Sequence, residues 1–149
     1  MTTAEAKQAF NIHAQPPALR DAYGRNTLGE SCLMARRLVE AGVLCVSFIH
    51  VVWDNHIKNF TSVRRDLMPS LDAAVATLFQ DLSDRGMLDS TLVLVTGEFC
   101  RTPRINKEAG RDHWGPAFTI MMGGGGLTGG GVVGSTDNHA SRPADSPYG

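Results

Sequence analysis

VLCVSFI at residues 43–49 and TLVLVT at residues 91–96 are the two stretches that decide the predicted fold. Each is almost unbroken apolar, which is typical of a strand covered on both faces and usually parallel to its neighbours. Between them, residues 62–85 carry apolar side chains at helical spacing, with a bend expected near Pro69. Strand, helix and strand in this order form a βαβ unit. We therefore predict the α/β class, a parallel sheet with flanking helices, with residues 117–122 as a third strand.

A second helix is predicted from Thr27 to the glycine at position 42. Thr27 and Glu30 have the spacing of a capping box, in which each side chain binds a free backbone N–H of the first turn. Upstream, Pro17 suits the first turn of a short helix that runs through Tyr23. The predicted organisation is a loosely patterned segment at 1–26, an α/β domain at 27–137 and a polar tail at 138–149.

The composition excludes several classes of protein. Hydrophobic residues make up 42% of the 149 residues, and 14 Lys and Arg face 15 Asp and Glu, for a net charge of -1. That balance argues against a nucleic-acid surface, which needs a clustered positive field. No apolar run approaches the roughly 20 residues that span a bilayer. A small sheet with two open edges predicts either that the strands are part of a larger sheet or that the chain self-associates through those edges. Cys32 and Cys45 are interpreted as buried small side chains.

Two loops that follow predicted strands carry the candidate functional residues. The first holds Asp54 and His56, and the second holds Glu98, Asp112 and His113. Loops at the carboxyl ends of parallel strands meet at one edge of a sheet, so these side chains are expected to converge. Carboxylates with imidazoles suit a divalent metal, zinc or manganese before magnesium or calcium. The alternative is structural: Asp54 and His56 cap the next helix, and Asp112 and His113 form a turn.

The second loop also carries Arg101, Arg104 and Arg111. The arginine fork matches phosphate and sulfate oxygens, so Arg101 and Arg111 are candidates for binding an anionic ester. The alternative is that two of the three are solvated, or pair with Glu108 and Asp112. The glycine-rich run at 123–131 lacks the Lys-Ser or Lys-Thr of a phosphate-binding loop and is interpreted as a flexible turn.

Several motifs in one order carry a resemblance to a known family. They are YGRN at 23–26, ARRLVEAG at 35–42, WDNH at 53–56, GEFCRTP at 97–103 and AGRDHW at 109–114. From about Ala9 to Asp137 the chain resembles a large bacterial family, domain of unknown function fifteen-oh-one, which is grouped with the sulfatases and alkaline phosphatases. The resemblance implies a sulfatase- or phosphatase-like fold with a divalent metal at Asp54, His56, Asp112 and His113, and with Glu98 beside them.

The resemblance also implies which part of the family is present. The chain corresponds to its C-terminal portion, so the nucleophile is expected outside this chain. We expect a metal-dependent hydrolase domain for a phosphate or sulfate ester, incomplete as it stands. The alternative is a non-catalytic module that binds a metal, an anionic ligand or a partner chain. Relatives often carry a twin-arginine export signal, and no such signal is evident here, so no compartment is assigned.

Overall fold

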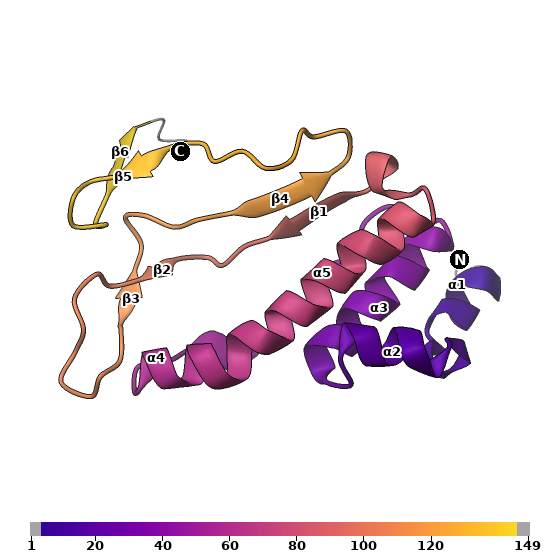
Figure 1. Ribbon diagram of the computed structural model, residues 1–149, viewed down its shortest axis with the longest axis horizontal. Helices are drawn as coiled ribbons and strands as arrows, with labels where there is room; N and C mark the ends of the chain where they lie inside the picture. Colours follow the sequence, from indigo (N-terminus) through magenta and orange to yellow (C-terminus); the bar gives the residue numbers. More distant parts are fainter. Residues whose placement is uncertain (1–3, 146–149) are drawn as a thin grey trace. The chain divides into compact units, whose positions relative to one another are not determined.

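The computed structural model describes residues 4–145. Figure 1 shows their helices and strands. The chain divides into two compact units. Met1–Trp53 and Val63–Gly86 form the first, called the helical unit here, and Asp54–Ser62 and Met87–Gly149 form the second, called the strand unit. Each unit is described by itself.

The helical unit is built from helices joined by short turns. They are α1 (Ala4–Ala9), a 3₁₀ turn (Ile12–Ala14), α2 (Pro17–Tyr23), α3 (Thr27–Glu40), a second 3₁₀ turn (Val51–Trp53), a π turn (Val63–Leu67) and α5 (Met68–Asp84). Helix α2 matches the short helix predicted after Pro17, and α3 starts where it was predicted. Its N-cap, however, is Asn26, whose side chain accepts a hydrogen bond from the Gly29 N–H at 3.0 Å. Asparagine is a stronger N-cap than threonine, so the N-cap is Asn26, one residue before the predicted Thr27.

The predicted bend near Pro69 takes a specific form. The π turn ends at Leu67, and α5 begins at Met68 with Pro69 in its first turn. A proline in that turn costs no hydrogen bond, because the first N–H groups of a helix have no partner within it. Helices α2, α3 and α5 pack against one another. Their buried side chains include Tyr23 and Leu33, both fully buried, and Ala74 and Leu82 of α5.

A buried ion-pair network ties the three helices together. Arg36 of α3 is 1% exposed, and its Nε lies 2.7 Å from Oδ2 of Asp81 on α5. The same oxygen accepts a hydrogen bond from the Tyr23 hydroxyl at 2.9 Å, and Arg85 donates to Oδ1 of Asp81 at 2.7 Å. Arg36 also pairs with Glu40. Burial, followed by the Asp81 charge, raises the pKa of Tyr23 well above its usual value. The hydroxyl is therefore neutral and acts as a donor.

The strand unit contains short strands and long loops. Its elements are α4 (Asn59–Ser62), a 3₁₀ turn (Leu88–Ser90), β1 (Leu92–Val95), β2 (Cys100–Arg101), β3 (His113–Trp114), β4 (Met121–Gly124), β5 (Ser135–Thr136) and β6 (Pro143–Asp145). The strands pair two by two: β1 with β4, β2 with β3, and β5 with β6. All three pairs are antiparallel.

The prediction of a parallel sheet is therefore wrong. Residues 91–96 do contain a strand, β1 (Leu92–Val95), but its partner is β4, in the antiparallel register that sets Leu92 opposite Gly124. Residues 43–49 form no strand and belong to none of the strand pairs within residues 4–145. An apolar run becomes a strand only when a second backbone accepts and donates its hydrogen bonds. The sequence pattern records the apolar character but not the partner.

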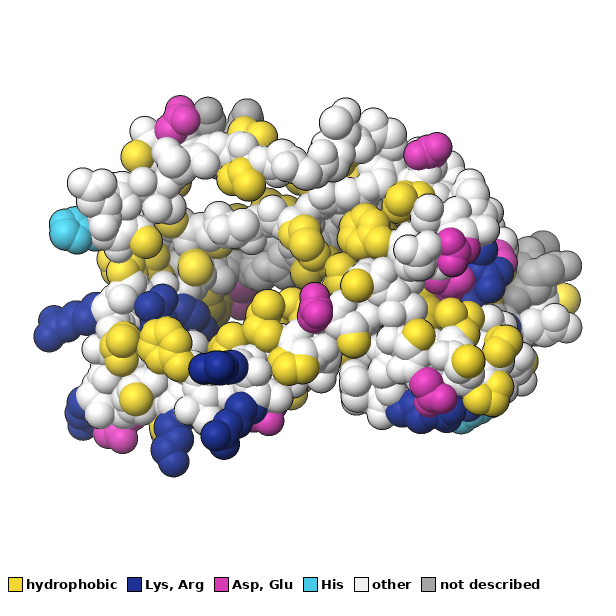
Figure 2. All heavy atoms as spheres, in the orientation of Figure 1, with side chains coloured by type: hydrophobic (Ala, Val, Ile, Leu, Met, Phe, Trp, Pro, Cys, Tyr) yellow, Lys and Arg dark blue, Asp and Glu magenta, His cyan; other side chains and the backbone are white. Residues whose placement is uncertain are grey.

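Large apolar side chains consequently reach the surface. Leu44 is 101% exposed and Ile49 is 88% exposed, and in the strand unit Leu92 and Met122 are more than half exposed. Figure 2 shows apolar side chains open to solvent on the face drawn. Cys32 is buried, as predicted, but Cys45 is exposed, because residues 43–49 lie outside any sheet. Over the described residues, no helix is both long and apolar enough to cross a membrane.

Candidate metal centre

The centre lies in the strand unit, where two loops run side by side. The Lys58 N–H donates to the Glu108 carbonyl and the Asn59 N–H to the Ala109 carbonyl, both at 3.0 Å. A longer contact of 3.4 Å joins the Arg111 N–H to the carbonyl of Asn55. These backbone bonds hold the loop that carries Asp54 and His56 against the loop that carries Asp112 and His113. The two motifs are distant in the sequence, so their convergence depends on this pairing.

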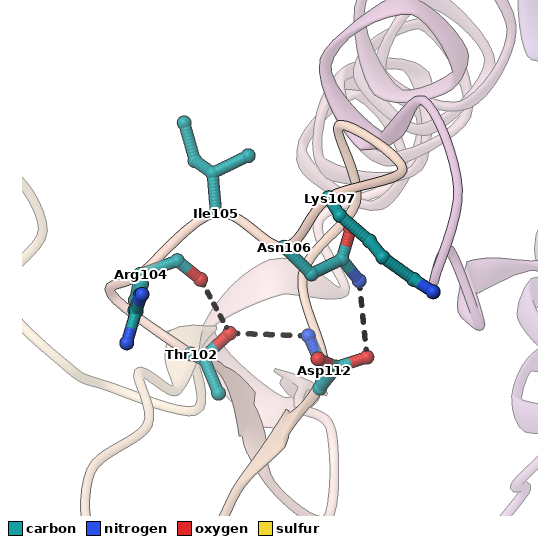
Figure 3. A pocket seen from close by; sticks show the side chains of 6 residues that line it. All are labelled: Thr102, Arg104, Ile105, Asn106, Lys107 and Asp112. Atoms are coloured by element: carbon teal, nitrogen blue, oxygen red, sulfur yellow. Dashed lines mark hydrogen bonds between the residues drawn. The ribbon is translucent and has the colours of Figure 1, made fainter.

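Asn106 organises the second loop. Its amide oxygen accepts hydrogen bonds from the N–H groups of Glu108 and Gly110, and its amide nitrogen donates to the His56 carbonyl at 3.0 Å. The same nitrogen donates to Oδ1 of Asp112 at 3.2 Å. Figure 3 shows this contact, together with the Thr102 hydroxyl, which accepts from the Asp112 N–H. One asparagine thus fixes the turn, the neighbouring loop and a carboxylate of the centre.

Gly110 allows the close approach of the two loops. It is buried, and a Cβ built on it would lie 1.7 Å from the His56 carbonyl oxygen. Real Cβ atoms essentially never come closer than 3.0 Å to such an atom. The absence of a side chain at position 110 is therefore a geometric requirement for the position of His56.

The short β2–β3 ladder places the other members of the centre. Its register sets Arg101 opposite His113 and Cys100 opposite Trp114. Directly opposed residues in an antiparallel pair have neighbouring side chains on one face. The Phe99 ring lies against the His113 imidazole, with centroids 4.2 Å apart and planes inclined by 32°. The same imidazole reaches Asp54, with Nε2 of His113 2.8 Å from Oδ1 of Asp54.

Three potential ligand atoms converge on one point. Oδ1 of Asp54 lies 2.8 Å from Nε2 of His113 and 3.0 Å from Nε2 of His56, and the two Nε2 atoms are 3.2 Å apart. Arg101 contacts the same Asp54 oxygen through Nη2 at 2.6 Å. One carboxylate oxygen has two lone pairs, so three nitrogen neighbours exceed its capacity for ordinary hydrogen bonds.

The His56 ring shows why this arrangement favours a cation. Its Nδ1 lies 2.7 Å from Oδ1 of Asp112, and the pKa of Asp112 is lowered, chiefly by this contact. The ionised carboxylate only accepts, so Nδ1 carries the proton. In the neutral ring Nε2 then directs its lone pair at Asp54, whose pKa is lowered to about 2 by the hydrogen bonds from His113 and then Arg101. Two acceptors face each other at 3.0 Å, a contact that needs a proton or a metal ion between them.

The donor set fits a divalent metal. At zinc bonds of about 2.0–2.1 Å, tetrahedral ligands lie about 3.3 Å apart, close to the distances of 2.8, 3.0 and 3.2 Å within this cluster. Asp54, His56 and His113 are the described residues whose ligand atoms gather in this way. The carboxylate–imidazole contact from Asp112 to His56 is the usual support of a metal-binding histidine. All three ligand side chains are at least 42% exposed, which leaves room for a further ligand.

The predicted site residues fall into three groups: those that offer ligand atoms, those that contact a ligand residue, and those that lie outside the cluster. Asp54, His56 and His113 offer ligand atoms at one point, whereas Asp112 contacts His56 from the far side of its ring. Glu98 is exposed in the bend between β1 and β2 and is not part of that cluster. Arg101 reaches the centre. Arg111 lies over the Phe60 ring, with its guanidinium carbon 5.1 Å from the centroid.

Other residues of the centre carry no clear signal in the sequence. Phe99 and Gly110 belong to two of the motifs that resemble the family, and Asn106 lies between those motifs, but nothing in their spacing indicates their roles. A pocket beside Asp112 is lined by Thr102, Arg104, Ile105, Asn106 and Lys107 (Figure 3). In this view Ile105 points away from the Asn106–Asp112 contact.

The chain thus consists of a helical unit and a strand unit, and two loops of the strand unit converge on an Asp-His-His cluster. A family model described as protein of unknown function (DUF1501) matches residues 1–149, so the chain belongs to that family. No curated protein and no solved structure matches the chain.

Proposed function

We propose that the chain supplies the metal- and anion-binding part of a hydrolase that acts on a phosphate or sulfate ester. The observation that carries this proposal is the convergence of two imidazole nitrogens and one carboxylate oxygen within 3.2 Å of one another, with a guanidinium beside them. The donor set of two nitrogens and one oxygen favours zinc over magnesium or calcium. On the resemblance described above, we place the family with the alkaline phosphatases and sulfatases, and this chain with the C-terminal part of the family.

Each residue has a defined task in this proposal. His56, His113 and Asp54 hold the ion, Asp112 fixes the tautomer of His56, and Arg101 contacts the ester anion. When bound, the metal polarises an ester oxygen or lowers the pKa of a water molecule. In hydrolysis the water oxygen bonds to phosphorus or sulfur, the bond from that atom to the alcohol oxygen breaks, and a water proton passes to the alcohol. We assign no nucleophilic side chain in this chain.

The experiment measures metal content and turnover together. Purified wild type, His56→Ala and His113→Ala are analysed by mass spectrometry for zinc and manganese, and the same samples are assayed with 4-nitrophenyl phosphate and 4-nitrophenyl sulfate. The proposal expects near-stoichiometric metal in the wild type and a loss in both variants, with turnover following metal. Glu98→Ala is the matched control, since Glu98 lies outside the cluster. Absence of metal from all samples after reconstitution rejects the proposal.

The second candidate is a module that binds metal and anion without catalysis. It is favoured by the exposure of the cluster, because Asp54 is 59% exposed and His113 is 49% exposed. Hydrolytic centres usually exclude bulk water, which strengthens the interactions inside them. Stoichiometric metal without turnover of either ester selects this candidate.

A further inference from the structure

We propose that Arg101 couples occupancy of the metal centre to binding of an anion. In the metal-free chain Arg101 holds Asp54, and it contacts the anion once a divalent ion takes the Asp54 oxygen. This inference rests on the proposed function, since it assumes the same metal centre. It adds a regulatory role for Arg101 and a binding order, metal before anion.

The first argument is the competition for one atom. Nη2 of Arg101 makes the shortest contact to Oδ1 of Asp54, at 2.6 Å. The two imidazole nitrogens lie 2.8 and 3.0 Å from that same oxygen, which is also the one that completes the ligand cluster. A divalent ion at this point therefore shares its carboxylate oxygen with a guanidinium. Two cations on one oxygen repel each other, so each weakens the binding of the other.

The second argument is the charge balance of the centre. Two carboxylates (Asp54 and Asp112) and one guanidinium (Arg101) sum to -1 with neutral imidazoles. A divalent ion changes this sum to +1, and a dianionic ester or sulfate returns it to -1. An anion bound before the metal would face a negative cluster, and one bound afterwards meets a positive one. An anion in contact with both the ion and the guanidinium would also relieve their repulsion.

The third argument is the way Arg101 is anchored. Its Nη1 donates to the Arg111 carbonyl at 3.2 Å, while Nη2 faces Asp54. The guanidinium carbon lies 6.0 Å from the centroid of the Phe99 ring, and the side chain is only 19% exposed. The β2–β3 register fixes the backbone of Arg101 opposite His113. The contact of Nη1 therefore holds the guanidinium in place. A small rotation of the guanidinium moves Nη2 from the Asp54 carboxylate to an anion, while Arg101 stays beside the centre.

Cobalt titrations test the coupling without any turnover. Co²⁺ binding is followed by its visible absorption, once with sodium sulfate and once with sodium perchlorate at equal ionic strength. The wild type is compared with Arg101→Ala, with Arg101→Lys and with Arg104→Ala, an exposed arginine of the same loop. Far-UV circular dichroism checks that each variant is folded.

We expect sulfate to lower the wild-type Kd for Co²⁺ by about 5- to 150-fold, the usual range of coupling between two sites. Arg101→Ala should bind Co²⁺ several-fold more tightly than the wild type in perchlorate, and sulfate should then have little effect. Arg101→Lys keeps the positive charge and should keep coupling of the same sign. Arg104→Ala should behave as the wild type.

Three results overturn the inference, and they are distinguishable. If the wild type binds Co²⁺ with the same Kd in both salts, the coupling is absent although the metal centre stands. If Arg101→Ala weakens Co²⁺ binding in perchlorate, Arg101 supports the ion rather than competing with it. If no folded variant binds Co²⁺, the proposed function fails together with the inference. A lack of ester turnover leaves the inference intact, because these titrations do not depend on it.

Discussion

Replacement of Gly110 by alanine should displace His56 and weaken metal binding. The added Cβ would lie 1.7 Å from the His56 carbonyl oxygen and 2.6 Å from the Ile57 nitrogen. The loops must therefore separate by at least 1.3 Å, the difference between 1.7 Å and the 3.0 Å closest approach of real Cβ atoms. Both contacts are to backbone, so no side-chain rotation relieves them.

The expected magnitude follows from the tolerance of metal coordination. Ligand distances in metal sites vary by only about 0.2 Å, so a displacement of 1.3 Å removes His56 from its place unless the backbone absorbs most of it. Loss of the supporting contacts around a metal ligand typically costs about 10- to 100-fold in affinity, and we expect a loss in that range. Overpacking of this kind also destabilises by about 1–3 kcal/mol.

The assay is a Co²⁺ or Zn²⁺ titration of Gly110→Ala beside wild type, with Gly115→Ala as the matched control. Gly115 lies in the same part of the chain, and a Cβ there meets nothing within 4 Å. The control should bind metal as the wild type does. A folded Gly110→Ala protein with wild-type affinity would show that the contact between Gly110 and His56 does not position the ligand.

Three further predictions concern the two units. Asp81→Asn leaves the buried Arg36 charge with Glu40 as its remaining ion-pair partner. The free energy of unfolding should therefore fall by about 3 kcal/mol in urea titrations followed by circular dichroism. A fall of less than about 1 kcal/mol would contradict a stabilising role of the ion-pair network. The pKa of Asp54 in the metal-free chain is about 2, below the unfolded aspartate value of about 3.9, so this group stabilises the fold above about pH 4 and the effect disappears as the pH falls through 2. Carboxyl ¹³C NMR should give this midpoint, and a midpoint of 3.9 or higher would refute it. Burial raises the pKa of Cys32 to about 11, so iodoacetamide at pH 8 should modify the two exposed cysteines and spare Cys32 until urea is added, as mass spectrometry of the adducts would show.

Local signals predicted the helices well. Pro17 and the capping residues near Thr27 act within one helical turn, so the sequence itself contains the interactions that place α2 and α3. The buried face of α3 was harder to predict. Arg36 is buried and Arg37 is half-buried, and this choice depends on Asp81 of α5, which is far away in the sequence. A periodic pattern identifies the helix but not the ion pair that decides its orientation.

Non-local pairing explains the errors in the sheet. VLCVSFI at 43–49 satisfies every local criterion for a buried strand, yet strand formation depends on a second backbone. Glu98 illustrates the consequence for the site. Its place in the predicted cluster assumed that the ends of parallel strands meet at one edge, but β1 pairs antiparallel with β4. Asp54, His56 and His113 do converge, through the loop contacts around Asn106 and Gly110.

The distribution of buried apolar side chains predicts that a metal bound at the proposed centre would have a structural role as well. Every buried hydrophobic residue in the described part of the chain, from Ala9 to Leu82, belongs to the helical unit. The strand unit is held by backbone pairs and by polar side chains such as Asn106, and a hydrogen bond contributes only about 0.5–1.5 kcal/mol net. A ligand at 100 times its Kd adds about 2.7 kcal/mol to the state that binds it. The free energy of metal binding at Asp54, His56 and His113 would therefore be comparable with that of several hydrogen bonds in these loops. We expect the ordering of the loops and the occupancy of the proposed centre to be linked.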